Sequence, residues 1–264
     1  MPTAPRKRLS RPFVVVCAGL GVLTVVYFAL SFVALGVRQT KTTAASYAGV
    51  DRLQIDGGSG DVTLIGEQRD DVRVVARTKW GLDEPDHLQQ FSDGVLKVDG
   101  GCGFWGGFGI DGCTTDFEIH VPADIPIRAE VDSGDLRASG LDGRVQLEAN
   151  SGDVRVEDVS GPLTVDVDSG DVIVIGYRGR DASVGANSGD LEIRTQVVPD
   201  RIKAVTDSGD VTIAVPGGEV YDVDTETDSG DTDVQVDQSV DAPRTIEANT
   251  NSGDVRVVRL ADAR

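Results

Sequence analysis

The chain has 264 residues, of which 44 are acidic and 25 are basic, so its formal net charge is −19. Residues 1–50 hold six of the basic residues and no acidic one, and the remaining 19 basic and 44 acidic residues give residues 51–264 a charge of −25. A field of this sign repels a phosphate backbone, so the composition excludes nucleic acid as a partner of this part of the chain.

The first element is an uncharged run of 25 residues, 13–37, which we interpret as a transmembrane helix. At about 1.5 Å per residue it covers ~37 Å, enough to cross a bilayer. A cleaved signal peptide is the alternative, since Ala34-Leu35-Gly36 resembles a weak cleavage site, although such apolar regions normally have only about 7 to 15 residues. Four basic residues precede the run, which predicts a cytoplasmic tail of residues 1–12. We therefore predict a single-pass protein of the bacterial cell membrane with its remaining residues outside the cytoplasm.

A short linker and one repetitive domain are expected after this helix. Residues 38–49 are mostly small and polar, which is typical of a linker. Residues 50–262 then carry a Ser-Gly-Asp motif eight times. From the second copy onward the copies are 18 to 23 residues apart, a period that suits one coil of a β-solenoid. The serines of the eight copies are Ser59, Ser133, Ser151, Ser169, Ser188, Ser208, Ser229 and Ser252.

The residues on either side of each motif alternate between apolar and polar. Leu163, Val165 and Val167 precede one copy, and Val172 and Val174 follow it. A period of two indicates strands with one buried face, and Gly or Pro residues between copies supply a second corner in most coils. The sequence thus predicts an all-β fold, a single-stranded β-solenoid or β-helix-like stack of repeats of about 18–23 residues.

The rhythm lapses at about residues 66–126, which we predict to be an irregular insertion. Residues 72–76 and 117–121 alternate as strands do, whereas residues 83–90 suit one or two helical turns.

These repeats resemble a known family. The Ser-Gly-Asp-Val turns, the strand that begins at Asp93-Gly94 and the strand that ends at Pro122 are similar to those of the bacterial "putative adhesin" family of β-strand-repeat domains of unknown function. The resemblance covers roughly residues 50–260. It implies the fold and supplies no catalytic residues.

The last residue of each motif is an aspartate, and these eight residues are candidate metal ligands. In an in-register stack they form a row of carboxylates that could bind calcium together with turn carbonyls. The alternative is that each aspartate only stabilises its turn by accepting a backbone hydrogen bond. Asn150, Asn187 and Asn251 replace the aspartate before the serine in three coils, which lowers the ligand charge and favours the structural role. The candidates are Asp61, Asp135, Asp153, Asp171, Asp190, Asp210, Asp231 and Asp254.

Two cysteines flank a glycine- and aromatic-rich loop. Because the domain is predicted to lie on the oxidising side of the membrane, we expect a disulfide between Cys102 and Cys113. The loop between them either displays Phe104, Trp105 and Phe108 to a partner or covers the open end of the stack.

No catalytic or cofactor motif stands out. Gly101, Gly103 and Gly106 match G-x-G-x-x-G but lack the strand-then-helix setting of a dinucleotide site, and His87 and His120 show no metal-ligand spacing. We therefore expect no cofactor, calcium excepted, and a non-enzymatic surface module that binds or scaffolds an envelope protein or glycan. The alternatives are a calcium-stabilised structural solenoid and a polysaccharide-active enzyme that uses carboxylates of the insertion.

Overall fold

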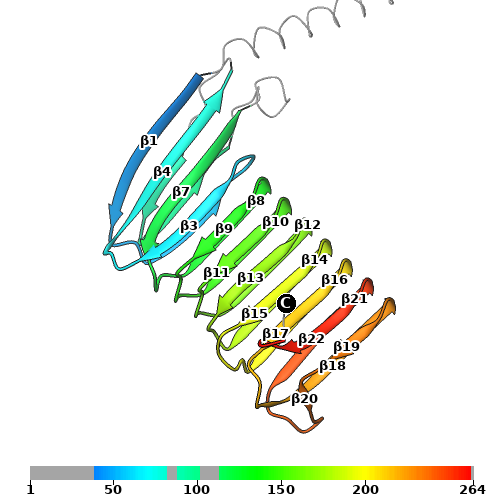
Figure 1. The fold of residues 1–264 in the computed structure, drawn as a ribbon. Helices are drawn as coiled ribbons and strands as arrows, with labels where there is room; N and C mark the ends of the chain where they lie inside the picture. The colour runs from blue at the N-terminus through cyan, green and yellow to red at the C-terminus, as the bar shows by residue number, and fades with distance from the viewer. Residues whose placement is uncertain (1–38, 82–87, 102–112, 263–264) are drawn as a thin grey trace, which may run out of the picture.

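The computed structural model describes residues 39–81, 88–101 and 113–262, and in these ranges the chain is all-β with 22 strands (Figure 1). The predicted transmembrane helix, residues 13–37, lies outside the described residues. Within the described ranges no helix has the length and apolar content needed to cross a membrane.

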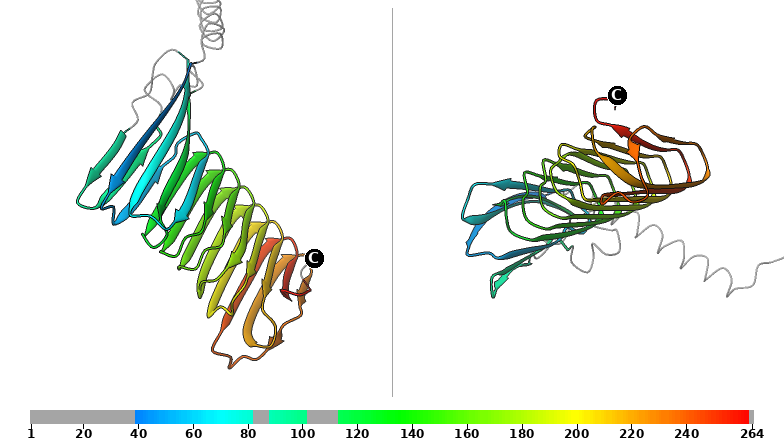
Figure 2. Two further views of the ribbon diagram at one scale, coloured as in Figure 1. Left: turned by 60° about the vertical axis from the view of Figure 1, so that its left-hand side comes forward. Right: turned by 90° about the horizontal axis from the view of Figure 1, so that it is seen from below.

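The strands form two sheets of eleven strands each, and most neighbours in the stack are parallel. In spatial order the first sheet consists of β1 (Gln39–Ala48), β4 (Asp71–Trp80), β7 (Thr114–Pro122), β3 (Val62–Glu67), β9 (Leu136–Ser139), β11 (Val154–Glu157), β13 (Val172–Tyr177), β15 (Leu191–Thr195), β17 (Val211–Val215), β22 (Val255–Arg259) and β19 (Thr232–Val234). The second consists of β20 (Asp237–Gln238), β18 (Val220–Ser229), β21 (Thr245–Ser252), β16 (Arg201–Ser208), β14 (Asp181–Ser188), β12 (Leu163–Ser169), β10 (Val145–Ser151), β8 (Ile127–Ser133), β2 (Arg52–Asp56), β6 (Val95–Asp99) and β5 (Leu88–Ser92). One strand of each sheet and the Ser-Gly-Asp turn between them make one coil, and Figure 2 shows the coils one behind another as flattened loops.

The core lies between the two sheets and consists of the alternating apolar residues. Leu147, Val165, Val184 and Ala204 are Cα neighbours on successive strands, and each is at most 1% exposed. Each coil buries too little apolar surface to be stable alone, so the core forms by stacking. The predicted all-β stack of repeats is confirmed at this level.

The turn glycines let the coils approach closely. Gly152 has a φ of +132°, and a Cβ at this position would overlap the carbonyl oxygen of Gly134 in the preceding coil. Only glycine meets both demands, since it accepts a positive φ and has no Cβ. The motif therefore sets the contact between coils as well as the turn.

The N-terminal wing, residues 39–122, corrects two predictions. Residues 39–48, predicted as part of a linker, form β1, which pairs antiparallel with β4 over ten residue pairs. The small and polar residues of β1 suit an edge strand whose outer side faces solvent. The prediction of helical turns for residues 83–90 is wrong at its C-terminal end, because Gln89 and Gln90 belong to β5 and pair with β6. Residues 83–87 lie outside the described part of the chain. The predicted insertion contains β4 to β7, and β4 is antiparallel to both of its neighbours.

The C-terminal coil departs from sequence order. Strands β21 and β22 lie between β16–β17 on one side and β18–β19 on the other, as the red strands in Figure 1 show. The coil that contains Ser229 therefore ends the stack, and the last coil of the sequence is inserted next to it.

Candidate functional site

The eight aspartates of the motif form one row along the stack. The Oδ1 atom of every aspartate except Asp231, which ends the row, accepts the backbone N–H of the aspartate in the next coil, for example from Asp171 to Asp153 at 3.0 Å and from Asp210 to Asp190 at 2.8 Å. The row runs in the spatial order Asp61, Asp135, Asp153, Asp171, Asp190, Asp210, Asp254 and Asp231.

This geometry supports the structural role that the sequence favoured. A carboxylate oxygen that accepts an amide hydrogen bond satisfies the turn backbone of its neighbour. Among the described residues no group of three or more His, Cys, Asp or Glu side chains is arranged to hold a metal ion. Calcium binding by the row stays a prediction.

A second polar row lies on the other side of the serines, and aspartate alternates with asparagine along it. In spatial order it consists of Asp132, Asn150, Asp168, Asn187, Asp207, Asn251 and Asp228. Each asparagine donates its amide N–H to a neighbouring carboxylate, over 3.0 Å from Asn150 to Asp132. The alternation keeps like charges from adjoining each other, which would destabilise in-register strands.

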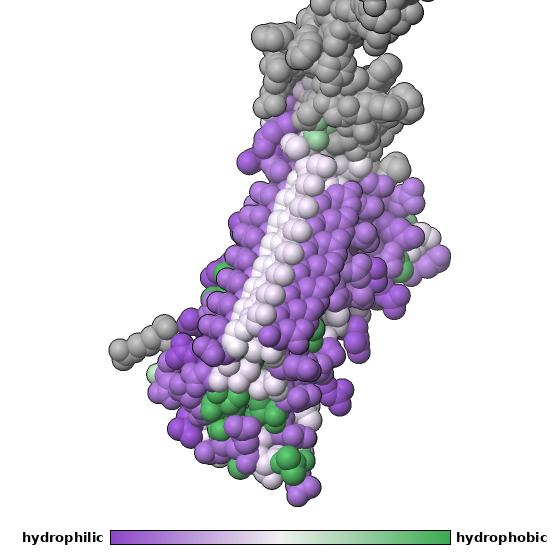
Figure 3. Space-filling view, turned by 90° about the vertical axis from the view of Figure 1, so that its right-hand side faces the viewer, coloured by the Kyte–Doolittle hydropathy of each residue, from purple (hydrophilic) through white to green (hydrophobic). Residues whose placement is uncertain are grey.

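Between the two rows the serines and glycines make a weakly polar stripe. The serines are Cα partners from coil to coil. Figure 3 shows a pale stripe along the stack with hydrophilic residues on both sides, as expected because serine and glycine have middling hydropathy. This corner repeats from coil to coil, and none of its serines or glycines differs from the equivalent residue in the other coils.

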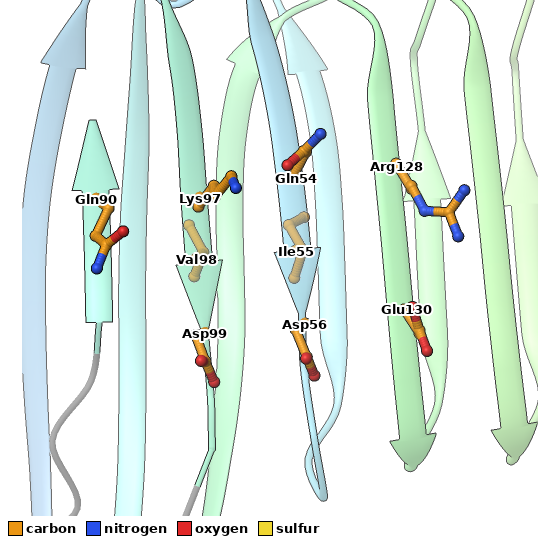
Figure 4. Close-up of a pocket in the computed structure, with 9 residues that line it drawn as sticks. All are labelled: Gln54, Ile55, Asp56, Gln90, Lys97, Val98, Asp99, Arg128 and Glu130. Atoms are coloured by element: carbon orange, nitrogen blue, oxygen red, sulfur yellow. The ribbon is translucent and has the colours of Figure 1, made fainter. Parts of the chain in front are cut away.

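One hollow lies on the outer face of the second sheet, over the first coils (Figure 4). Its volume is about 340 Å³, and it is lined by side chains from β2, β5, β6 and β8. Lys97, Gln54 and Arg128 are register partners in one row, with Gln90 beside Lys97. Asp99, Asp56 and Glu130 form a second row two residues further along the strands.

The two rows give the hollow both donors and acceptors. Arg128 makes an ion pair of 2.9 Å with Glu148 of the next strand, whereas Lys97 makes no ion pair with the described residues. Three carboxylates on neighbouring strands are about 4.8 Å apart by sheet geometry, so their charges repel and favour a cationic group between them. Chemically, this surface can bind a polar partner through hydrogen bonds and charge.

A second, larger hollow of about 520 Å³ follows on the same face. It lies where Gly185 leaves room beside Asp166, and Lys203 is at its border. Partial burial and the nearby charge of Glu148 raise the pKa of Asp166 above its usual range. The carboxylate row therefore continues from the first hollow into the second.

His120 lies on the outer face of the other sheet between two carboxylates. Its Nδ1 is 2.9 Å from Glu67, and its Nε2 is 3.0 Å from Glu118. The hydrogen bond with Glu118, helped by Glu67, raises the pKa of His120, and the hydrogen bond with His120 lowers the pKa of Glu67. These residues link β3 with β7 and form a structural clamp.

Several predicted site residues fall outside the described part of the chain. Cys102, Phe104, Trp105 and Phe108 are among these, so the disulfide to Cys113 and the aromatic contact stay predictions. Sequence reasoning missed the mixed rows around Lys97 and Arg128, because β6, the strand of Lys97, carries no copy of the repeat motif. Alternation in residues 95–99 and 127–131 was the available signal, but it does not reveal which strands are neighbours.

Comparison with known proteins gives the family of the chain. A family model described as Toastrack DUF4097 matches residues 124–261. A protein described as a "putative adhesin" from Bacteroides fragilis is 13% identical, with 84% of this chain and 97% of that chain covered and a TM-score of 0.49. A "putative cell adhesion protein" from Clostridium sporogenes is 11% identical, with 84% and 100% covered and a TM-score of 0.36. No curated protein matches the sequence.

Proposed function

This chain belongs to the Toastrack DUF4097 family, and on that premise we propose that it is a membrane-anchored, non-enzymatic surface module that binds or scaffolds another component of the bacterial envelope. The two solved structures named above are described as a "putative cell adhesion protein" and a "putative adhesin". The stack serves as a rigid scaffold, because its turns and core repeat from coil to coil. Its function then lies in what the outer faces bind.

The observation that carries the proposal is the hollow on the first coils. Lys97 and Arg128 stand beside the carboxylates of Asp56, Asp99 and Glu130 on strands of a well-packed sheet. Residues on strands hold fixed positions, so such a surface is pre-organised for a partner. A row of donor groups beside a row of carboxylate acceptors suits a glycan or a polar protein surface.

The correction of the linker makes the proposed anchoring more specific. If residues 13–37 span the membrane as the sequence predicts, only Arg38 separates the span from β1, which begins at Gln39. The wing would then lie at the membrane surface, and the remaining coils would extend the stack away from it. The contact predicted for Phe104, Trp105 and Phe108 remains a second candidate contact.

A charge-reversal experiment tests the proposal. Full-length protein is extracted from its membrane with detergent and mixed with isolated cell envelopes, and binding is measured as the fraction of the protein that sediments with the envelopes. The variant with Lys97→Glu and Arg128→Glu should lose most of this binding. The matched control is Arg155→Glu with Arg194→Glu, which makes the same charge change on the outer face of the other sheet.

Two results would contradict the proposal. Equal loss in both double variants would indicate a nonspecific charge effect rather than this hollow. Unchanged binding in both, with loss after replacement of the three loop aromatics, would move the site to the loop.

A further inference from the structure

The C-terminal coil, strands β21 and β22, occupies a slot between two coils that precede it in the sequence. It pairs with β16 and β17 on one side and with β18 and β19 on the other. Without it, the stack would end at β16–β17, and the coil of β18 and β19 would lack its only neighbouring coil.

Burial explains why this coil lies inside the stack. Its inward residues Ile246, Ala248, Val255 and Val257 are at most 1% exposed. The coil that ends the stack instead turns Thr225, Thr227 and half-buried valines inward. An apolar coil needs a neighbour on both sides, whereas a coil with polar inward residues can cap a stack.

Charge matches the inserted coil to the cap. Residues 219–241 contain nine acidic residues and no basic one. The inserted coil and its connection supply three arginines, which lie 3.1 to 3.7 Å from carboxylates of the cap in the pairs Arg244–Glu219, Arg256–Asp233 and Arg259–Asp237. Asn251 also separates Asp207 from Asp228 in the alternating row. Direct contact between the cap and β16–β17 would place those two carboxylates side by side.

The slot recognises residues of the coil rather than its covalent connection. That connection, residues 239–244, runs over the surface, and Val240 in it is 85% exposed. The same segment from another molecule would make the same strand pairs, buried contacts and ion pairs. Exchange of an identical element costs little, because each interaction that is broken within one molecule forms again between the two molecules.

We propose that this slot is an exchange site whose partner is the C-terminal coil of a second copy of this chain. Two modules that exchange their C-terminal coils are joined at their distal ends by contacts that each already makes within itself. Confinement of copies in one membrane would favour the exchange through a higher local concentration. The inference does not depend on the envelope partner proposed above.

The test uses two full-length chains that are expressed together, one with Lys203→Cys and the other with Glu247→Cys. These residues are Cα partners across the slot, so a short bismaleimide can join the two chains only when β21 of one lies beside β16 of the other. Linked peptides are identified by mass spectrometry, which separates them from links through native cysteines. The control chains carry Glu130→Cys and Glu148→Cys, Cα partners within the middle of the stack.

Linkage between chains at 203 and 247, with none in the control pair, is the expected result. Absence of that linkage, or equal linkage in the control, would overturn the exchange.

A second arm tests the slot itself. A chain that ends at Ser239 should lose protection of Glu226 against a glutamate-specific protease, and a synthetic peptide of residues 240–264 should restore it. The same peptide with Ile246→Asp and Val257→Asp should not. Full protection of Glu226 in the shortened chain would show that the cap docks without an inserted coil and would overturn the proposal.

Discussion

The middle of the stack, residues 127–215, and the N-terminal wing bury the same kind of alternating apolar face, but they choose strand partners differently. In the middle, every strand before β16 lies beside the corresponding strand of the next repeat. In the wing, β4 lies antiparallel between β1 and β7 and pairs with neither β3 nor β5, the strands next to it in the sequence. The turn motif accounts for the difference, because it fixes the contact between coils where it is present and the wing mostly lacks it.

The largest expected effect comes from breaking a turn in the middle of the stack. Gly152→Ala forces a Cβ onto the carbonyl oxygen of Gly134 and places a non-glycine residue at a φ of +132°. We expect a loss of at least about 3 kcal/mol in the free energy of unfolding, measured by urea denaturation. Gly185→Ala, in strand β14, is the matched control and should change stability by less than about 1 kcal/mol, because its Cβ would lie 3.2 Å from Asp166 Oδ1 and 3.9 Å from the Val205 carbonyl oxygen. Similar losses in both would refute the role assigned to the turn glycine.

A smaller effect is expected from the aspartate row. Asp153→Ala removes the acceptor of the Asp171 amide and should cost about 1 kcal/mol, whereas Asp153→Asn keeps an acceptor and should cost clearly less. Urea denaturation of the two variants in EDTA compares them. Equal losses would mean that the charge of the carboxylate matters more than its hydrogen bond.

The alternating row gives a third and weaker effect. Asn150→Asp places three carboxylates in succession, at positions 132, 150 and 168, and should cost roughly 0.5 to 1 kcal/mol at low salt. Salt should reduce the loss, because it screens exposed charges. Asp168→Asn changes the same row without a new like-charge contact and should show no such salt dependence. Thermal melting at low and high salt distinguishes the two.

The smallest effect belongs to the wing and depends on pH. The pKa of His120 is raised above its ordinary 6.5, so its clamp stabilises the fold fully below that pH and loses its contribution as pH rises through the raised pKa. The difference in melting temperature between wild type and His120→Gln should therefore shrink above neutral pH. The lowered pKa of Glu67 should make it shrink again in acid, below the ordinary 4.5. A difference that is constant from pH 4 to 9 would contradict the clamp.

The sequence predicts the regular coils well because one motif carries both their turns and their partners. Counting from each serine identifies the buried residues Val165 and Val174, and their burial is confirmed. It fails at β1, since a run of threonine and alanine is equally suited to a linker and to an edge strand. Only tertiary pairing with β4 decides between them.

The spatial order of the last coils could in principle be predicted from the sequence. Thr225 and Thr227 take inward positions that are apolar in most other repeats, which is the mark of a capping coil. The hollow around Lys97 and Arg128 offered no comparable signal, because it depends on which strands become neighbours in the wing.

The central claim is that the turns stabilise the stack without a metal ion. Thermal unfolding of the full-length protein in EDTA and in millimolar calcium tests this claim most directly. Because a backbone amide already occupies the Oδ1 of seven of the eight aspartates, the melting temperature should be the same in both solutions. A rise of about ten degrees or more in calcium, which corresponds to several kcal/mol of binding linkage, would contradict this and make the aspartate row a metal site.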